Sequence, residues 1–323
     1  MRGPVGLRGV TWLVWRQHRA VRWALLTGSV LVAGFFLIGG YGAADAVTPR
    51  LSECAGAAAE KSRECVELLK EFQQQHQYPL RRPLQVLVLL PFVFGLFLGA
   101  PLFAQELESG TYRTVLSQSV TRTRWFLAKL AVPAALTVLF GGLVTAAATW
   151  WWHTIDGPVG SGFPWYGPMP YDAIGPAPVA KSLLLLLAGV TSSLLIRRTV
   201  AAMGATVVVG AVLLYALEQV RGALWPVRVA QARGGAVPVP DGAWLRAEGL
   251  LSATGQRVPD ASACLSAGDY EQCLARRGVT GEWAEYHPTS HLWPLQWMET
   301  GVCLAAAGVL ALFCFWWTRR RLT

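Results

Sequence analysis

The side chains best suited to binding chemistry lie together in one segment, residues 105–129. This segment holds two carboxylates, a glycine, several hydroxyls and four basic residues between two long apolar runs, 84–104 and 130–152. Charged groups of both signs orient and steer a protein partner. We therefore predict that residues 105–129 form a docking site.

Known catalytic patterns are absent from the sequence. It contains no G-x-x-x-x-G-K-[ST] phosphate loop, no HExxH, no CxxC pair and no GxSxG. The five histidines are scattered along the chain. His287 and His291 have helical spacing, but Pro288 intervenes and no third ligand is evident, so no metal site is expected. We predict a non-catalytic chain, with an enzyme carrying an unrecognised site as an alternative.

The elements that must position the docking segment are membrane spans. A hydrocarbon core about 30 Å thick needs about 20 apolar residues in a helix. Six runs satisfy this length: 23–41, 84–104, 130–152, 179–196, 199–217 and 295–317. With only 15% charged residues, the chain is predicted to be an all-α integral membrane protein, a single transmembrane domain over residues 1–323.

The distribution of cations predicts the orientation of these spans. With the N-terminus inside, the inner segments 1–22, 105–129, 197–198 and 318–323 hold fourteen Lys and Arg against two acids. The rest of the chain holds fourteen cations against seventeen acids. Excess Lys and Arg mark cytoplasmic loops, so both termini are predicted to be cytoplasmic. The basic balance needs no nucleic-acid partner to explain it.

Residues that end or begin helices recur along the docking segment. The second span should continue as a helix until Gly110, because glycine readily takes the left-handed cap conformation. Thr111 can then cap a short helix over 112–117, and Ser119 or Thr121 can cap the third span. The basic start of that span, including Lys129, is expected among the inner headgroups. The alternative is an ordinary re-entry loop.

Residues 4–22 precede the first span and are predicted to form an amphipathic helix on the inner membrane surface. Arg8, Trp15 and Arg19 share one helical face, and apolar residues share the other. The alternative is a disordered basic tail that acts only as a topology signal.

Two outer loops, 42–82 and 222–294, carry four of the six cysteines. Helices are expected over 57–77, ended by Pro79 and Pro83, and over 269–277. Four cysteines allow three pairings. Cys54–Cys65 and Cys264–Cys273 are favoured because each closes a short loop, and free thiols are the alternative.

Aromatic residues gather near the outer ends of the spans. We expect Trp150, Trp151, Trp152, Trp165 and Tyr166 to form an outer interfacial belt. A weaker expectation concerns the start of the sixth span. There Trp293, Trp297 and Glu299 either shape an outer gate or anchor the helix at the interface.

The docking segment also resembles a known family. Its order E-x-E-x-G-T-x-R-x-x-x-S-Q-S-V-T-R-x-R-W, from Glu106 to Trp125, is similar to the cytoplasmic coupling segment of ABC-2 type permeases, the membrane subunits of bacterial ATP-binding-cassette exporters. Residues 286–299, YHPTSHLWPLQWME, resemble the start of the last span in actinobacterial members. The preference for Arg over Lys suits such an origin.

The resemblance implies a partner and an assembly. A separate ATP-binding subunit, which would hold ATP and Mg, docks under residues 105–124, and a second permease chain, identical or different, completes the pathway. This chain would then need no cofactor of its own. The residues implied to form or brace the dock are Glu106, Glu108, Gly110, Thr111, Arg113, Ser117, Gln118, Thr121 and Arg122. Tyr112, Val115 and Leu116 could fill an apolar cleft. Residues 1–22 would match the connecting helix.

These observations predict a multi-pass permease subunit of an ATP-driven exporter in the cell membrane, in contact with lipid. Glu218, Glu299 and Lys181 fall near the outer ends of the spans, which leaves the depths almost free of the charges that proton-driven transporters use. Energy should therefore come from a partner. The alternative is a sensor or resistance partner of an ATPase that moves no cargo.

Overall fold

The computed structural model describes residues 19–55, 63–111, 121–159, 163–233, 237–258, 264 and 270–321. The helices expected over 4–22 and 112–117 therefore lie outside the described residues, apart from the last four positions of the first.

Helices make up most of the chain. The first half contains α2 (Arg19–Ala46), α3 (Pro49–Ala55), α4 (Arg63–Phe72), η1 (Gln73–Gln77), α5 (Tyr78–Val88), α6 (Leu90–Phe94), η2 (Gly95–Gly99), α7 (Pro101–Ser109), α9 (Arg122–Leu136), η3 (Thr137–Gly141) and α10 (Gly142–Val159). The second half contains α11 (Pro168–Tyr171), α12 (Ala177–Ile196), α13 (Thr199–Val220), η4 (Arg221–Ala223), β1 (Arg228–Arg233), β2 (Trp244–Ser252), β3 (Arg257–Val258), α15 (Tyr270–Arg276), β4 (Val279–His287), η5 (Thr289–His291) and α16 (Leu292–Arg321).

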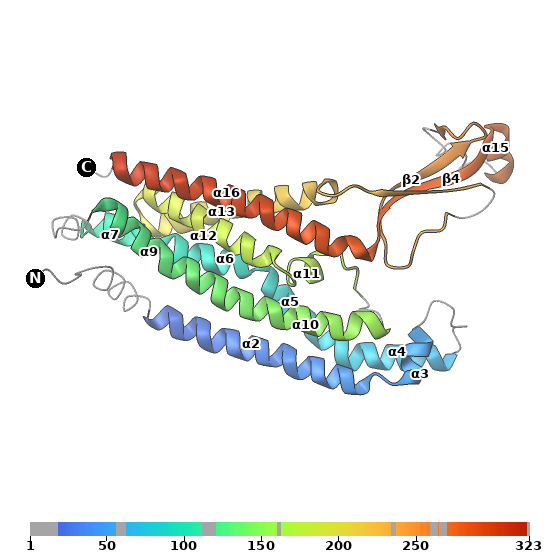
Figure 1. Ribbon diagram of the computed structural model, residues 1–323, viewed down its shortest axis with the longest axis horizontal. Coiled ribbons are helices and arrows are strands. Elements are labelled where there is room, and N and C mark those ends of the chain that lie inside the picture. The colour runs from blue at the N-terminus through green and yellow to red at the C-terminus, as the bar shows by residue number, and fades with distance from the viewer. Residues whose placement is uncertain are drawn as a thin grey trace, which may run out of the picture.

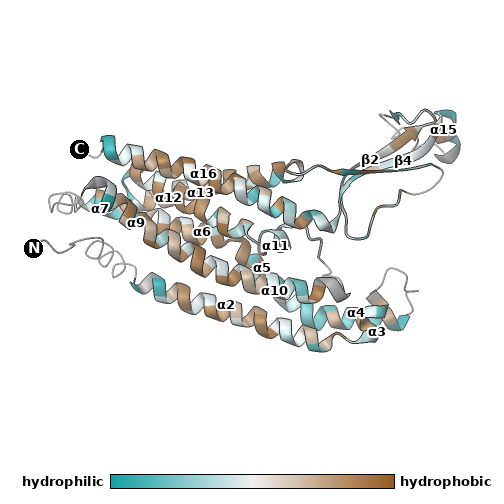
Figure 2. Cartoon of the chain, viewed as in Figure 1, coloured by the Kyte–Doolittle hydropathy of each residue, from teal (hydrophilic) through white to brown (hydrophobic). Residues whose placement is uncertain are grey.

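Six of the helical stretches are long and apolar enough to cross a membrane, which confirms the predicted number. They are Arg22–Ala46, Leu90–Ser109, Thr123–Ile155, Ala177–Ile196, Thr199–Ala223 and Thr289–Arg320. Figure 2 shows apolar residues along these helices and hydrophilic residues gathered toward their ends. The chain is therefore a multi-pass membrane protein.

The spans run side by side in one bundle (Figure 1). The start of α2 and the end of α16 lie at one end of it, which we call the terminal end, together with α7 and the start of α9. The β-sheet and helices α3 and α4 lie at the opposite, distal end. Helix α12 has the largest buried share of the six spans, with α13, α16, α7 and η2 packed around it.

Small residues let α12 and the second span approach closely. A Cβ atom added at Gly189 would lie 2.5 Å from the Gly95 carbonyl oxygen, and one added at Gly99 would lie 2.4 Å from that of Leu186. Close backbone approach through glycine is a common basis of helix packing in membranes. Helix α12 therefore packs closely against the second span, which leads to the docking segment.

The region between α13 and the last span differs from the all-α expectation. Strands β1 to β4 form an antiparallel sheet in the order β1-β4-β2-β3, with Arg228 opposite Tyr286 and Trp244 opposite His287. The all-α prediction was wrong here because short alternating strands give a weak signal and their pairing joins distant parts of the chain. Helix α15 confirms the helix expected over 269–277.

The described part of the loop between the first two spans is mostly helical, as predicted, but Pro79 and Pro83 do not end the helix. Helix continues from α4 through η1 and α5 into the second span. The wider π-helical turn η1 lies directly before Pro79, where it relaxes the crowding between the proline ring and the preceding turn.

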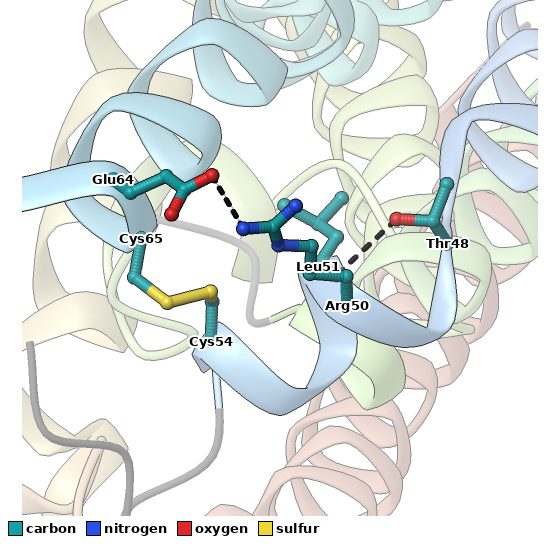
Figure 3. Close-up of a disulfide and its surroundings, with 6 residues drawn as sticks. All are labelled: Thr48, Arg50, Leu51, Cys54, Glu64 and Cys65. Carbon is teal, nitrogen blue, oxygen red and sulfur yellow. Dashed lines mark hydrogen bonds and ion pairs between the residues drawn. A yellow bond between two sulfur atoms is a disulfide. The ribbon is translucent and has the colours of Figure 1, made fainter. Parts of the chain in front are cut away.

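Two disulfides confirm the favoured cysteine pairing. Cys54 joins Cys65, and Cys264 joins Cys273, with Cα atoms 5.2 and 5.6 Å apart. Figure 3 shows the first bond connecting α3 to α4, beside an ion pair between Arg50 and Glu64.

The expected aromatic belt is wrong for three of its five members. Trp151 and Trp152 are fully buried, and Trp165 is 4% exposed. They belong to a core cluster in which α10 packs on α2 and the 163–176 segment covers the bundle. Tyr166 is half-buried and stacks on Trp244 at 5.3 Å. These rings pack the distal end instead of facing lipid headgroups.

Candidate coupling site

The predicted docking segment begins and ends as expected. Helix α7 stops at Gly110, whose φ of 72° is the left-handed cap conformation. Thr121 is the N-cap of α9, and its Oγ1 accepts a hydrogen bond from the Arg124 amide at 3.4 Å. Thr111 and Thr121 are both exposed. The structure therefore places two rigid helix ends on either side of a short connection at the terminal end.

Part of the predicted site cannot be placed. Six of its residues lie outside the described part of the chain: Tyr112, Arg113, Val115, Leu116, Ser117 and Gln118. The side chain of Arg122 also lies outside it. Arg8 and Trp15 of the predicted connecting helix also lie outside it, whereas Arg19 is exposed at the start of α2.

Glu106 is engaged inside the bundle instead of facing a partner. Its Oε1 lies 2.6 Å from the Lys129 ammonium, which also donates to the Leu102 carbonyl at 2.9 Å. The ammonium lies 5.3 Å from the ring centres of both Phe103 and Trp125. The expectation that Lys129 sits among headgroups was wrong: Lys129 is 4% exposed and joins α9 to α7.

Glu108 joins α7 to the fifth span, α13. Its Oε2 accepts hydrogen bonds from the backbone N–H and the hydroxyl of Thr199, both at 2.9 Å. Thr199 is the first residue of α13, where unpaired amides favour a carboxylate. Nearby, the Phe103 amide donates to Ser193 Oγ of α12 at 3.1 Å. Helix α7 is thus bonded to α9, α12 and α13.

A second set of charges, toward the distal end, was not predicted. Lys181 Nζ lies 2.5 Å from Asp172 Oδ1 and 2.6 Å from Glu299 Oε1. Arg221 Nη2 lies 2.7 Å from Asp172 Oδ1, and its Nε lies 3.3 Å from Glu299 Oε2. These two acids and two bases, which we call the charge ring, alternate in sign and balance one another.

The charge ring joins α12, η4 and α16 to the segment after α11. Burial alone would raise the pKa of Asp172, but Lys181 and Arg221 outweigh it and hold that pKa below its ordinary value. The guanidinium of Arg221 stacks over Tyr171 at 3.9 Å. Burial, followed by the charge of Glu299, raises the pKa of the Tyr171 hydroxyl, which stays protonated.

The structure does not bring the expected gate residues together. Glu299 is fully buried in the charge ring, whereas Trp297 is 63% exposed. Residues two positions apart in a helix are rotated by about 200° around its axis. The side chains of Trp297 and Glu299 therefore point in nearly opposite directions. Trp293 is half-buried and stacks on His153 at 5.6 Å.

A histidine pair links the sheet to the last span. His287 Nδ1 lies 3.0 Å from His291 Nδ1, and His287 Nε2 lies 3.0 Å from the Gly222 carbonyl oxygen. A carbonyl only accepts, so Nε2 of His287 donates and its Nδ1 accepts from His291. The ranges that the structure describes contain no cluster of three or more potential metal ligands.

Sequence spacing could not have shown the ion pairs. Glu106 and Lys129 lie on different helices, and the four members of the charge ring come from three elements and the segment after α11. The available signal was the presence of charges at the ends of apolar runs, where an ionisable residue facing the bundle needs a partner.

The bundle of long apolar helices defines the class: a multi-pass helical membrane protein. The chain belongs to the family described as ABC-2 membrane transporter related, whose model matches residues 26–221. The matched range includes the docking segment and ends at Arg221 of the charge ring. No curated protein and no solved structure matches the chain. The family and the bundle support a transporter permease-type role.

Proposed function

We propose that this chain is the permease subunit of an ATP-driven exporter in the cell membrane, and that a separate ATPase docks on residues 105–124. The observation that carries this proposal is the bonding of α7 to three spans through Glu106, Glu108 and Phe103. A surface element braced in this way transmits motion, whereas an unattached loop would absorb it.

In this proposal the carboxylates have a bracing role. Glu106 and Glu108 are committed to Lys129 and Thr199, so the ATPase contacts fall to residues 111–122 and to the connecting helix over 1–22. The ATPase supplies the ATP and Mg site, and a second permease chain completes the pathway. The predicted orientation, with both termini inside, puts the terminal end of the bundle beside the ATPase.

Helices α12 and α13 connect α7 to the charge ring toward the distal end. Helix α13 begins at Thr199, bonded to Glu108, and is followed at once by Arg221 of the charge ring. Helix α12 carries Lys181 near one end and Ser193 near the other. A shift of α7 would therefore move α12 and α13 along their whole length. The four charged residues of the charge ring would then change how they pack against one another.

The test replaces Gly110 with Val and, separately, Arg113 with Ala, in the complex co-purified with its ATPase. Val at a φ of 72° is strained even though no atom crowds its Cβ. Transport per ATP hydrolysed should fall at least severalfold in both variants. Gly255→Val is the matched control, since Gly255 also has a positive φ and open space but lies in the turn between β2 and β3, away from the docking segment.

Unchanged coupling in both variants would contradict the docking role. Loss of coupling in Gly255→Val as well would show a general defect. The complex can also be reconstituted into vesicles. ATP hydrolysis by these vesicles without accumulation of cargo would instead favour the sensor alternative.

A further inference from the structure

A cavity of about 610 Å³ lies along α10, α12 and α16, but its lining is almost wholly apolar. A smaller one, of about 300 Å³, has mixed chemistry. It lies at the distal ends of the second and fifth spans, beside the charge ring. Its polar residues are Asp172, Lys181, Glu218 and Arg221.

Two helices form its walls. On α13, Ala211, Leu214, Tyr215 and Glu218 recur at helical spacing and line the cavity on one side. Opposite them, Leu89, which joins α5 to α6, lines the cavity together with Phe92. Leu89 and Tyr215 are 56% and 65% exposed, so the mouth of the cavity opens on the surface of the bundle.

The charges of this cavity do not cancel. Within the charge ring, Lys181 and Arg221 each form ion pairs with both Asp172 and Glu299. Asp172 keeps 15% of its side chain exposed, whereas the other three members keep 5% or less. Glu218 is exposed, and no cation of the described ranges lies within ion-pair distance of it. The accessible charge of the cavity is therefore negative.

We propose that this cavity binds an amphiphile with an ammonium headgroup. The ammonium would pair with Glu218 and reach the exposed part of Asp172, near the Tyr215 ring. The tail would lie along Leu89, Phe92 and Leu214. An ammonium group would give the exposed Glu218 carboxylate a charge-assisted hydrogen bond, which is stronger than a neutral one.

Two sources supply this chemistry: an amine-bearing membrane lipid, and a cationic amphiphile carried as cargo. The cargo source rests on the exporter function proposed above, whereas binding itself needs neither ATP nor a partner. Failure of binding would leave the coupling proposal intact, and loss of coupling would leave binding intact.

The experiment measures thermal unfolding of the full chain in a neutral sugar detergent with dodecylammonium, and with dodecyl sulfate for comparison. A ligand that binds only the folded state raises the unfolding temperature, by an amount that grows with the ratio of its free concentration to its Kd. Glu218→Gln should weaken dodecylammonium binding by about tenfold, as loss of one partly shielded ion pair would. Glu248→Gln, an exposed carboxylate of β2, is the matched control and should change nothing.

A second variant, Leu89→Trp, narrows the mouth without changing charge and should also weaken binding. Equal stabilisation by both detergent ions, or equal behaviour of Glu218→Gln and Glu248→Gln, would overturn the proposal. Mass spectrometry of co-purified lipids then separates the sources. An amine lipid retained by the native chain and lost in Glu218→Gln supports the membrane source. Dodecylammonium binding without such a lipid supports the cargo source.

Discussion

At the scale of single residues, the buried pair of Glu106 and Lys129 assigns a structural role to a carboxylate that the sequence places in a docking motif. Their charged atoms lie 2.6 Å apart between α7 and α9, with the lysine 5% exposed. A buried charge is tolerated only when it is paired. The pair therefore fixes the geometry of both helix ends next to the coupling segment.

Removing the lysine charge tests this role. Lys129→Met should destabilise the chain by about 3–5 kcal/mol, because Glu106 is left buried without its partner. Unfolding by denaturant in detergent micelles measures the change. The double variant Glu106→Gln with Lys129→Met should regain most of the loss. Lys70→Met, an exposed change on α4, should stay within about 0.5 kcal/mol. Similar values for Lys70→Met and Lys129→Met would rule out the bracing pair.

Residue-level features that depend on near neighbours could be predicted from the sequence. Gly110 as a helix end and Thr121 as a cap follow from backbone preferences within one turn. The local disulfide Cys54–Cys65 follows from loop length. The partner of Lys129 could not be predicted, because it depends on how α9 is rotated against α7.

At the scale of elements, Glu108 makes the start of α13 depend on the end of α7. Glu108→Ala removes the acceptor for the Thr199 amide and hydroxyl. Hydrogen exchange of the first-turn amides of α13 should become faster, while exchange in α12 stays unchanged. Glu248→Ala in the sheet serves as the control. Unaltered exchange at the α13 start would show that the cap does not hold these elements together.

The junction of β4, η4 and the last span should respond to pH. Burial lowers the pKa of His287 from an ordinary value of 6.5, its bond to Gly222 opposes this, and Arg246 lowers the pKa further. Protonated His287 would also present a second donor to His291. The junction is therefore fully stable above about pH 6.5 and loses stability as pH falls through the lowered pKa.

Melting temperatures between pH 7.5 and pH 5 measure this effect. The native chain should lose stability as the pH falls, and His287→Gln should flatten that dependence. His153→Gln, at an exposed ring, should keep the native slope. A native slope that persists in His287→Gln would assign the titration to other groups.

Elements differ in how well the sequence reveals them. Apolar length identifies a span without knowledge of its neighbours, so the six spans were predicted correctly. The sheet was missed because β1 and β4 pair across about fifty residues of sequence, and each strand alone is a weak signal.

At the scale of the whole molecule, the paired charges lie toward both ends of the bundle and the same helices connect them. Helix α12 contacts α7 through Ser193 and the charge ring through Lys181. Its 20 residues span about 30 Å. A movement at the terminal end therefore has a direct structural route to the charge ring and to the cavity beside it.

Cross-linking tests most directly whether an ATPase docks on the segment after α7. A photoreactive maleimide is attached to Thr111→Cys, an exposed position next to Gly110, in the complex with its ATPase. Thr254→Cys, an exposed position on a turn of the sheet, is the control. We expect an adduct with the ATPase at position 111, with a yield that changes when nucleotide is added, and no adduct at position 254. An intact complex without an adduct at position 111, or labelling of that position only from outside the cell, would contradict it.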